Sequence, residues 1–252
     1  MSSLTVHGLT DVGCVRANNE DNLLVDTIAP GLHFMAVIDG VGGHAGGEIA
    51  SQSAVDAFAE LIRDGKLKTA DDPAVRELLL EMAVQRAHIS ISRRAQDNPA
   101  LLGMACAATA LIATGDDFSF AQVGDTACYH WSPDTGAKQL SIDQTIAQQL
   151  YERGQIGEAE LETHPDRHVL AQALGVEAIA SPLQAAVTTA QWLSGDRLLL
   201  CSDGLNNMVS LPDITQVLSE EASVVAAAEN LIARALDAGG RDNVTVIVAE
   251  NS

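Results

Sequence analysis

Two stretches in the first half of the chain repeat apolar residues with the spacing of an amphipathic α-helix. The first runs from about Glu48 to Asp64, and Gly65 after it is typical of a helix end. The second opens at Asp72-Pro73, where an N-cap residue precedes a proline at the first helical position. A later pair of helices is predicted over Pro212–Glu220 and Ser223–Asp237. The residues expected to face the core in the first two helices are Ile49, Val55, Phe58, Ala59, Ile62, Val75, Leu78, Leu79, Met82 and Ile89.

Short apolar or β-branched runs bounded by turn residues predict strands around these helices. Three connections (115–117, 132–136 and 194–196) are as short as hairpin loops, which indicates antiparallel pairing. Because blocks of strands alternate with blocks of helices and no linker or repeat interrupts the chain, we expect one α+β domain over residues 1–252. The predicted strands span Gly31–Ile38, Ala107–Thr114, Phe118–Val123, Thr126–Trp131, Arg197–Cys201 and Val244–Ala249.

The composition indicates which side chains fill the core and which classes of binding partner are disfavoured. Of the 252 residues, 47% are hydrophobic but only 3% are aromatic, so a single large core must be filled by aliphatic side chains. The formal net charge of −20 repels nucleic acid phosphates and anionic lipid headgroups. The densest basic pair, Arg93-Arg94, is typical of a solvated helix face. We therefore expect neither a nucleic acid nor a membrane partner.

The four cysteines indicate a reducing compartment. Cys14, Cys106, Cys128 and Cys201 are far apart and form no C-x-x-C pair, which is typical of small buried side chains in a reduced protein. The first residues contain no basic segment followed by an apolar one, and no apolar run approaches about 18 residues. We therefore expect a cytoplasmic protein.

An aspartate stands next to glycine or asparagine at four points where an apolar strand pattern ends or begins. A single Asp-Gly pair more often marks a hairpin turn. Four such carboxylates would need a cation if the strand ends converged, because a pair about 4 Å apart repels by roughly 1 kcal/mol in water and about 4 kcal/mol at an effective dielectric near 20. Ligation by oxygen alone favours Mg²⁺ or Mn²⁺ over Zn²⁺. The four are Asp39, Asp125, Asp203 and Asp242.

The segment before the strand that starts at Asn22 combines one arginine with two acids. Arg16 presents a fixed fork of donors suited to phosphate oxygens, and Glu20 and Asp21 are suited to hold metal-bound waters. This combination suggests a phosphate beside a metal. A surface ion pair between Arg16 and Glu20 explains the same segment and stays open.

Eight short motifs follow one another over nearly the whole chain, from about Gly8 to Ala249. They are Arg16-x-x-Asn19-Glu20-Asp21, Asp39-Gly40-x-Gly42-Gly43-His44-x-x-Gly47, Val123-Gly124-Asp125-Thr126, Leu140-Ser141-x-Asp143, His164-Pro165, Ala173-Leu174-Gly175, Cys201-Ser202-Asp203-Gly204-Leu205 and Gly240-Arg241-Asp242-Asn243-Val244-Thr245. This ordered set resembles the metal-dependent protein phosphatases (type 2C-like) in their compact bacterial form. The resemblance implies an αββα sandwich of two antiparallel sheets with a helix pair outside each, and a mobile flap at about residues 144–168.

The resemblance also implies a metal ligand set. Asp39 would bridge two metal ions, and Gly40 would offer its carbonyl oxygen to the first. Asp203 and Asp242 would complete the second. Asp125, together with Asp203, would hold a weaker third ion. The implied cofactor is therefore Mn²⁺ or Mg²⁺, with two or three ions.

The remaining implied roles concern substrate and chemistry. Arg16 would bind the substrate phosphate, and Glu20 and Asp21 would act mainly through metal-bound waters. The implied activity is hydrolysis of phosphoserine and phosphothreonine in proteins by a water that two metal ions activate, with Arg16 and Asp39 as catalytic residues. The implied partners are phosphorylated proteins and a cognate Ser/Thr kinase, as in a signalling pathway.

Two departures from the family pattern bear on catalysis and packing. Val41 stands where many eukaryotic relatives have a histidine thought to protonate the leaving group, so the general acid stays open. His44 is a candidate for this acid, although a histidine in a glycine-rich turn more often has a packing role. Residues 104–109 lack the usual Gly-Thr or Gly-Ser step. Since no expected ligand lies there, we expect activity to survive this change.

Other classes explain the sequence less well. Gly40-x-Gly42-x-x-Ala45, with Glu60 about twenty residues on, loosely matches a dinucleotide-binding fingerprint, but a carboxylate stands before its glycines, and two helices and then hairpins follow it instead of alternating βα units. A cysteine phosphatase is excluded because no cysteine precedes an arginine by six positions, and no Gly-x-Ser-x-Gly elbow supports a serine hydrolase. The non-enzyme alternative is a pseudophosphatase that binds without turnover, which has no reason to keep mutually repelling carboxylates.

Overall fold

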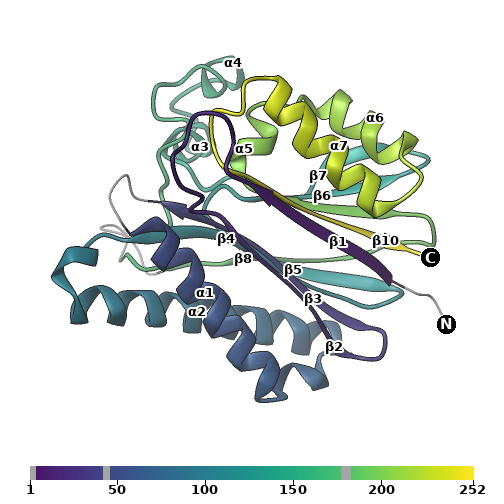
Figure 1. The fold of residues 1–252 in the computed structure, drawn as a ribbon, viewed down its shortest axis with the longest axis horizontal. Helices are drawn as coiled ribbons and strands as arrows, with labels where there is room; N and C mark the ends of the chain where they lie inside the picture. Colours follow the sequence, from purple (N-terminus) through teal and green to yellow (C-terminus); the bar gives the residue numbers. More distant parts are fainter. Residues whose placement is uncertain (1–3, 42–45, 177–182) are drawn as a thin grey trace.

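Two antiparallel sheets pack face to face in the computed structural model, which describes residues 4–41, 46–176 and 183–252 (Figure 1). In spatial order, the first sheet contains β1 (Leu4–Asp11), β10 (Val244–Asn251), β9 (Arg197–Cys201), β6 (Ala127–Ser132) and β7 (Gly136–Gln139). The second sheet contains β2 (Asn22–Ala29), β3 (Leu32–Val41), β4 (Ala105–Ala113), β5 (Asp117–Val123) and β8 (Ala186–Gln191).

A pair of helices covers the outer face of each sheet. The helices α1 (Gly47–Arg63) and α2 (Pro73–Asp97) lie on the second sheet, and α6 (Leu211–Glu220) and α7 (Val224–Asp237) lie on the first (Figure 1). The shorter helices are η1 (Lys66–Thr69), η2 (Pro99–Leu101), α3 (Ile146–Glu152), α4 (Glu158–Leu161) and α5 (Asp203–Asn206). This arrangement confirms the predicted α+β class and the αββα sandwich. Within the described ranges, no helix is both long and apolar enough to cross a membrane.

Three apolar layers hold the sandwich together. The inner faces of the two sheets meet around Met35, Leu111, Phe120, Leu200 and Ile247, all with an exposed fraction of 1% or less. A second layer lies between the second sheet and α1 and α2, and a third lies between the first sheet and α6 and α7. Alanine is frequent in both outer layers, so the helices approach the sheets closely without aromatic side chains.

The predicted ends of the long helices are confirmed, but the predicted face of α2 is partly wrong. The Asp72 side chain accepts hydrogen bonds from two backbone N–H groups of the first turn, and Gly65 has the left-handed φ of 69° expected after α1. Leu78 and Ile89, however, are 65% and 44% exposed. The helix instead buries Arg76 and a row of small and aliphatic residues, which are Leu80, Ala83, Val84, Ala87, Ile91 and Ala95.

One predicted hairpin is wrong and two are confirmed. The turns at 115–117 and 132–136 join β4 to β5 and β6 to β7, which are paired strands. The turn at 194–196 instead carries the chain from β8 in the second sheet to β9 in the first. Its Asp196 Oδ2 accepts from the Leu193 N–H at 2.9 Å and lies 2.8 Å from His130 Nε2. A short loop therefore crosses between the two sheets, and Asp196 holds it through one hydrogen bond within the turn and one contact to β6.

Three of the four cysteines follow the expectation from the sequence. Cys106, Cys128 and Cys201 are buried as free thiols. Cys14 is free but exposed, because it lies in the loop between β1 and β2. That loop, α5 and the segment with α3 and α4 gather at one end of the sandwich, opposite the C-terminus (Figure 1).

Candidate active site

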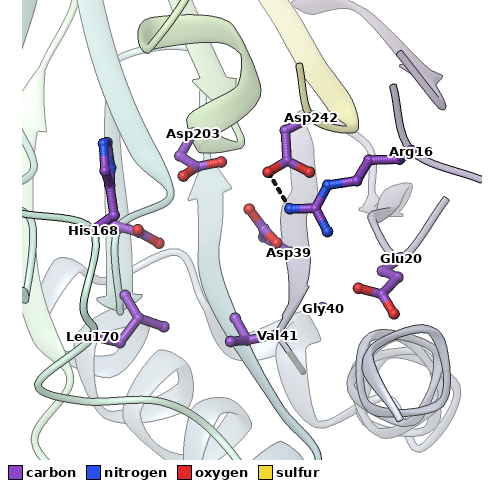
Figure 2. Close-up of a pocket in the computed structure, with 10 residues that line it drawn as sticks. Arg16, Glu20, Asp39, Gly40, Val41, His168, Leu170, Asp203 and Asp242 are labelled. Atoms are coloured by element: carbon purple, nitrogen blue, oxygen red, sulfur yellow. Dashed lines mark hydrogen bonds and ion pairs between the residues drawn. The ribbon is translucent and has the colours of Figure 1, made fainter. Parts of the chain in front are cut away.

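A cavity of about 380 Å³ at this end of the sandwich collects residues from distant parts of the sequence. Figure 2 shows carboxylates and one guanidinium converging on it. Every residue to which the sequence assigns a metal or phosphate role lines this cavity, with the exception of Asp21. The lining residues are Arg16, Glu20, Asp39, Gly40, Val41, Asp125, His168, Leu170, Asp203 and Asp242.

The two Asp-Gly pairs of the site are not hairpin turns. Asp39 and Gly40 lie inside β3, and a Cβ atom on Gly40 would lie 2.3 Å from the carbonyl oxygen of Gly47. Asp203 and Gly204 open α5, and a Cβ on Gly204 would lie 1.9 Å from the carbonyl oxygen of Asn243. Glycine is therefore required because another part of the backbone passes close by. Each aspartate is held where two chain segments touch.

Burial and mutual repulsion raise the pKa values of three aspartates in the cavity, Asp39, Asp203 and Asp125. Burial, and then the charges of Asp21 and Asp203, raise the pKa of Asp39 well above its usual value. Burial and the charge of Asp242 raise the pKa of Asp203, whose carboxyl is close enough to Asp39 to share a hydrogen bond. Burial, with the charges of Asp203 and Asp143, raises the pKa of Asp125 to about 8. Such a cluster favours the binding of a cation, which would relieve the repulsion.

Arg16 pairs with Asp242 rather than with Glu20. Its Nη2 lies 2.5 Å from Oδ2 of Asp242, and the two side chains are 45% and 37% exposed (Figure 2). The surface pair with Glu20 that the sequence left open is therefore not formed. Burial and the charge of Glu48 raise the pKa of Glu20, and the charge of Arg16 opposes this rise. The guanidinium lies at the edge of the carboxylate cluster, where an anion brought to the cluster would meet it.

Asp21 lies beneath the cavity rather than in its wall. It is 6% exposed, and its Oδ2 accepts hydrogen bonds from Ser202 Oγ at 2.6 Å and Thr245 Oγ1 at 2.7 Å. Burial raises its pKa to about 7, and the two hydroxyl donors oppose this rise. The charge of Asp21 in turn raises the pKa of Asp39, so the two carboxyls are neighbours.

Asn243 positions the loop that carries Arg16 and Glu20, a role that the sequence did not reveal. Its Nδ2 donates to the carbonyl oxygens of Val12 and Asn18, each at 2.9 Å, and its Oδ1 accepts from the Glu20 N–H at 2.8 Å. Asn243 and Ser202 each stand next to a predicted metal ligand, and Thr245 lies three residues after Asp242, all within quoted motifs. That adjacency is the signal that could have identified them.

The segment predicted as a flap supplies His168 to the cavity, and Leu170 follows just after it. His168 is exposed and its charge lowers the pKa of Asp203, although the sequence assigned it no role. Val41, 37% exposed, lines the same cavity. The candidate acid His44 lies outside the described residues.

The donor set fits a hard divalent cation. Its members are carboxylates and a backbone carbonyl, which are the oxygen ligands preferred by Mg²⁺ and Mn²⁺. In the described ranges, no group of three or more Asp, Glu, His or Cys side chains already has the spacing of a coordination shell. Asp242, in particular, is turned towards Arg16.

Comparison with known proteins places the chain in a family. Residues 15–238 match the family described as Protein phosphatase 2C. The chain is 36% identical over 243 residues to the serine/threonine protein phosphatase PstP of Mycobacterium tuberculosis, covering 96% of this chain but only 44% of PstP. It is 31% identical over 244 residues to the serine/threonine phosphatase stp of Listeria innocua, covering 96% of this chain and 94% of stp.

Solved structures agree with the sequence comparisons. A crystal structure of the M. tuberculosis phosphatase PstP/Ppp superposes with a TM-score of 0.84 at 33% identity, covering 99% of each chain. The catalytic domain of PstP in complex with two manganese ions superposes with a TM-score of 0.79 at 32% identity, covering 100% of this chain and 99% of that one. The chain therefore belongs to the protein phosphatase 2C family.

Proposed function

We propose that this chain is a metal-dependent phosphatase that hydrolyses phosphoserine and phosphothreonine in proteins. The observation that carries the proposal is the cavity in which Asp39, Asp203 and Asp242 converge beside Arg16. Carboxylates suit the metal, and the guanidinium suits the phosphate. The named activities of PstP and stp support the same reaction class.

The proposed cofactor is a pair of Mn²⁺ or Mg²⁺ ions. Asp39 and the carbonyl oxygen of Gly40 would hold one ion, and Asp39, Asp203 and Asp242 the other. When bound, such a pair lowers the pKa of a water that attacks the phosphorus and neutralises charge on the phosphate. The manganese complex of PstP supports the pair. Asp125, 8% exposed and close to Asp203, is the proposed ligand of a weaker third ion.

The other side chains prepare the substrate and the ligands. Arg16 would bind the equatorial phosphate oxygens through its planar fork, after its Nη2 leaves Asp242. Glu20 and Asp21 would orient waters of the metal site, and Asp21 can do so only from below because two hydroxyls already hold its Oδ2. Val41 offers no proton to the leaving group. We propose that water protonates the seryl or threonyl oxygen.

The wider setting belongs to the same proposal. Phosphorylated proteins are the proposed substrates, and a Ser/Thr kinase that creates them is the proposed functional partner. A cytoplasmic location is proposed from the reduced cysteines. Movement of residues 144–168 over the cavity is proposed because His168 reaches the cavity from this segment.

Hydrolysis of a phosphothreonine peptide, measured with EDTA and then with added Mn²⁺, tests the proposal. We expect no phosphate release with EDTA and full recovery with Mn²⁺. A protein that binds Mn²⁺ and the phosphopeptide but releases no phosphate would instead be a pseudophosphatase. The dinucleotide-binding alternative does not fit, because β3 pairs antiparallel with both β2 and β4.

A further inference from the structure

A set of hydroxyl and amide groups beneath the cavity converges on one atom, Oδ2 of Asp21. Ser202 Oγ and Thr245 Oγ1 both donate to this oxygen, at 2.6 and 2.7 Å. Ser202 and Thr245 are fully buried, and they come from the first sheet, whereas Asp21 precedes the first strand of the second sheet. The contact therefore joins the two sheets directly under the proposed metal ligands.

The hydrogen bonds behind these two donors run in one direction only. The Asp21 N–H donates to Oδ1 of Asn19 at 3.1 Å, which leaves the Asn19 amide nitrogen as a donor to Thr10 Oγ1 at 2.9 Å. Thr10 Oγ1 lies 2.7 Å from Thr245 Oγ1. Because the single hydroxyl proton of Thr245 is used on Asp21, the proton between the two threonines must come from Thr10. Behind the second donor, Ser202, the Thr245 N–H donates to Ser202 Oγ at 2.9 Å.

The links from Asn19 through Thr10 and Thr245, and from the Thr245 N–H through Ser202, all lead to the same carboxylate oxygen. Aligned donors polarise one another, so each hydroxyl proton at Asp21 is a better donor than an isolated one. Ser202 and Thr245 hold Oδ2 from two sides of a fixed frame, because Ser202 directly follows β9, Thr245 lies in the neighbouring β10, and the Ser202 N–H donates to the Thr245 carbonyl oxygen at 3.0 Å.

We propose that Ser202, Thr245, Thr10 and Asn19 are positioning residues for the metal site, acting through Asp21. The inference rests on the proposed function, since it assigns these residues to the same metal centre. The array holds the Asp21 carboxyl in one orientation near Asp39. Loss of one of its donors should therefore weaken metal binding, although none of the four residues is a proposed metal ligand.

The test is a double-mutant cycle read by calorimetric Mn²⁺ titration. We expect Thr245→Val to raise the Kd for Mn²⁺ by about tenfold, as for other residues that orient metal ligands, and Thr245→Ser to restore binding because it keeps the hydroxyl. In an Asp21→Asn background, Thr245→Val should change the Kd no further. Ser119→Ala, which removes a fully buried hydroxyl in β5 that accepts from Arg76 of α2, serves as the control and should leave the Kd unchanged.

Two results would overturn the inference. One is an unchanged Kd in Thr245→Val, and the other is an equal loss with and without the Asp21 carboxylate, which would make the hydroxyl merely structural. If Thr245→Val does not fold, Ser202→Ala and Thr10→Val complete the same cycle. Wild-type protein that binds no Mn²⁺ would refute the proposed function as well. If the wild-type protein binds Mn²⁺ and hydrolyses the phosphopeptide, but the effects of Thr245→Val and Asp21→Asn on the Kd are additive, only the role of the array would be refuted.

Discussion

Arg16 Nη2 and Asp242 Oδ2 lie 2.5 Å apart, so the candidate phosphate-binding group and a candidate metal ligand neutralise each other. Both side chains are more than one third exposed, so solvent weakens the pair and its contribution to stability is small. A metal ion that recruits Asp242 would have to displace the guanidinium. This displacement would leave the Arg16 guanidinium free to bind a phosphate.

This pair predicts that Arg16→Ala binds Mn²⁺ about two- to fivefold more tightly, since an exposed pair is worth up to about 1 kcal/mol. The sequence alone predicts a higher KM for phosphorylated substrates and unchanged metal affinity. Titration calorimetry with Mn²⁺ separates the two expectations. Arg234→Ala, which breaks the exposed 3.2 Å pair with Asp213 on α6, is the control and should leave the Kd unchanged. A higher Kd for Mn²⁺ in Arg16→Ala would show that Arg16 supports the metal site.

The three central carboxylates should each be essential. Asp39→Asn, Asp203→Asn and Asp242→Asn are expected to lower kcat/KM by about a hundredfold or more, because each amide loses a charged ligand of the proposed ions. Phosphothreonine peptide hydrolysis at saturating Mn²⁺ measures this loss. Asp134→Asn, in the exposed turn between β6 and β7, is the matched control. Near-normal turnover of any folded variant of the three would remove that residue from the ligand set.

Asp125→Ala should lower kcat and leave two ions bound. Asp125 follows β5, whereas Asp39 lies in β3, so the proposed third ion loses a ligand while the bridged pair keeps its own. The stoichiometry from calorimetry checks that two ions stay bound, and peptide turnover over a range of Mn²⁺ concentrations checks the lower kcat. Full activity at every Mn²⁺ concentration would exclude the third ion from the mechanism.

The raised pKa values of Asp21, about 7, and Asp125, about 8, predict how stability depends on pH. A carboxyl whose pKa is higher in the folded than in the unfolded chain destabilises the fold above the folded pKa, and this cost disappears as the pH falls to the unfolded value. The unfolding temperature of the metal-free protein should therefore rise as the pH is lowered from about 8.5 to about 5.5. Asp21→Asn and Asp125→Asn should each flatten this rise, and an unchanged slope in both would contradict the assignment.

Metal binding should release protons near neutral pH for the same reason, because a ligand must lose its proton before it binds. Titrations in two buffers with different ionisation enthalpies measure the number released, and the two heats should differ. Identical heats would mean that the carboxyls are already ionised in the metal-free protein.

Arg76 should matter for stability and not for chemistry. Its fully buried guanidinium lies 2.6 Å from Asp117 Oδ1 and donates to the carbonyl oxygens of Ala70 and Asp71, far along the sheet from the cavity. Arg76→Met is expected to lower the free energy of unfolding by about 3 kcal/mol, since several buried groups lose their partner. Urea unfolding measures this change, and Arg93→Met on the exposed face of the same helix is the control. Equal stability of the two variants would refute the structural role.

Local patterns predicted most of the elements because their causes are local. The Asp72-Pro73 start of α2, the Gly65 end of α1 and the hairpin at 115–117 depend on neighbouring backbone groups alone. The buried face of α2 could not be predicted in this way. Leu78 and Ile89 are as apolar as the residues it buries, but only the row of small residues lets α2 approach the second sheet.

The sequence by itself determined which side chains are the candidates for the chemistry: Arg16 and the aspartates of the ordered motifs, whose residue types suit phosphate and hard cations. The tertiary structure alone decided how they meet. Arg16 pairs with Asp242 rather than with the nearby Glu20, and Asp21 is held by hydroxyls of Ser202 and Thr245 from the opposite sheet. Contacts of this kind join residues about two hundred positions apart, and they depend on how two sheets stack. The spacing of residues along the chain does not predict that stacking.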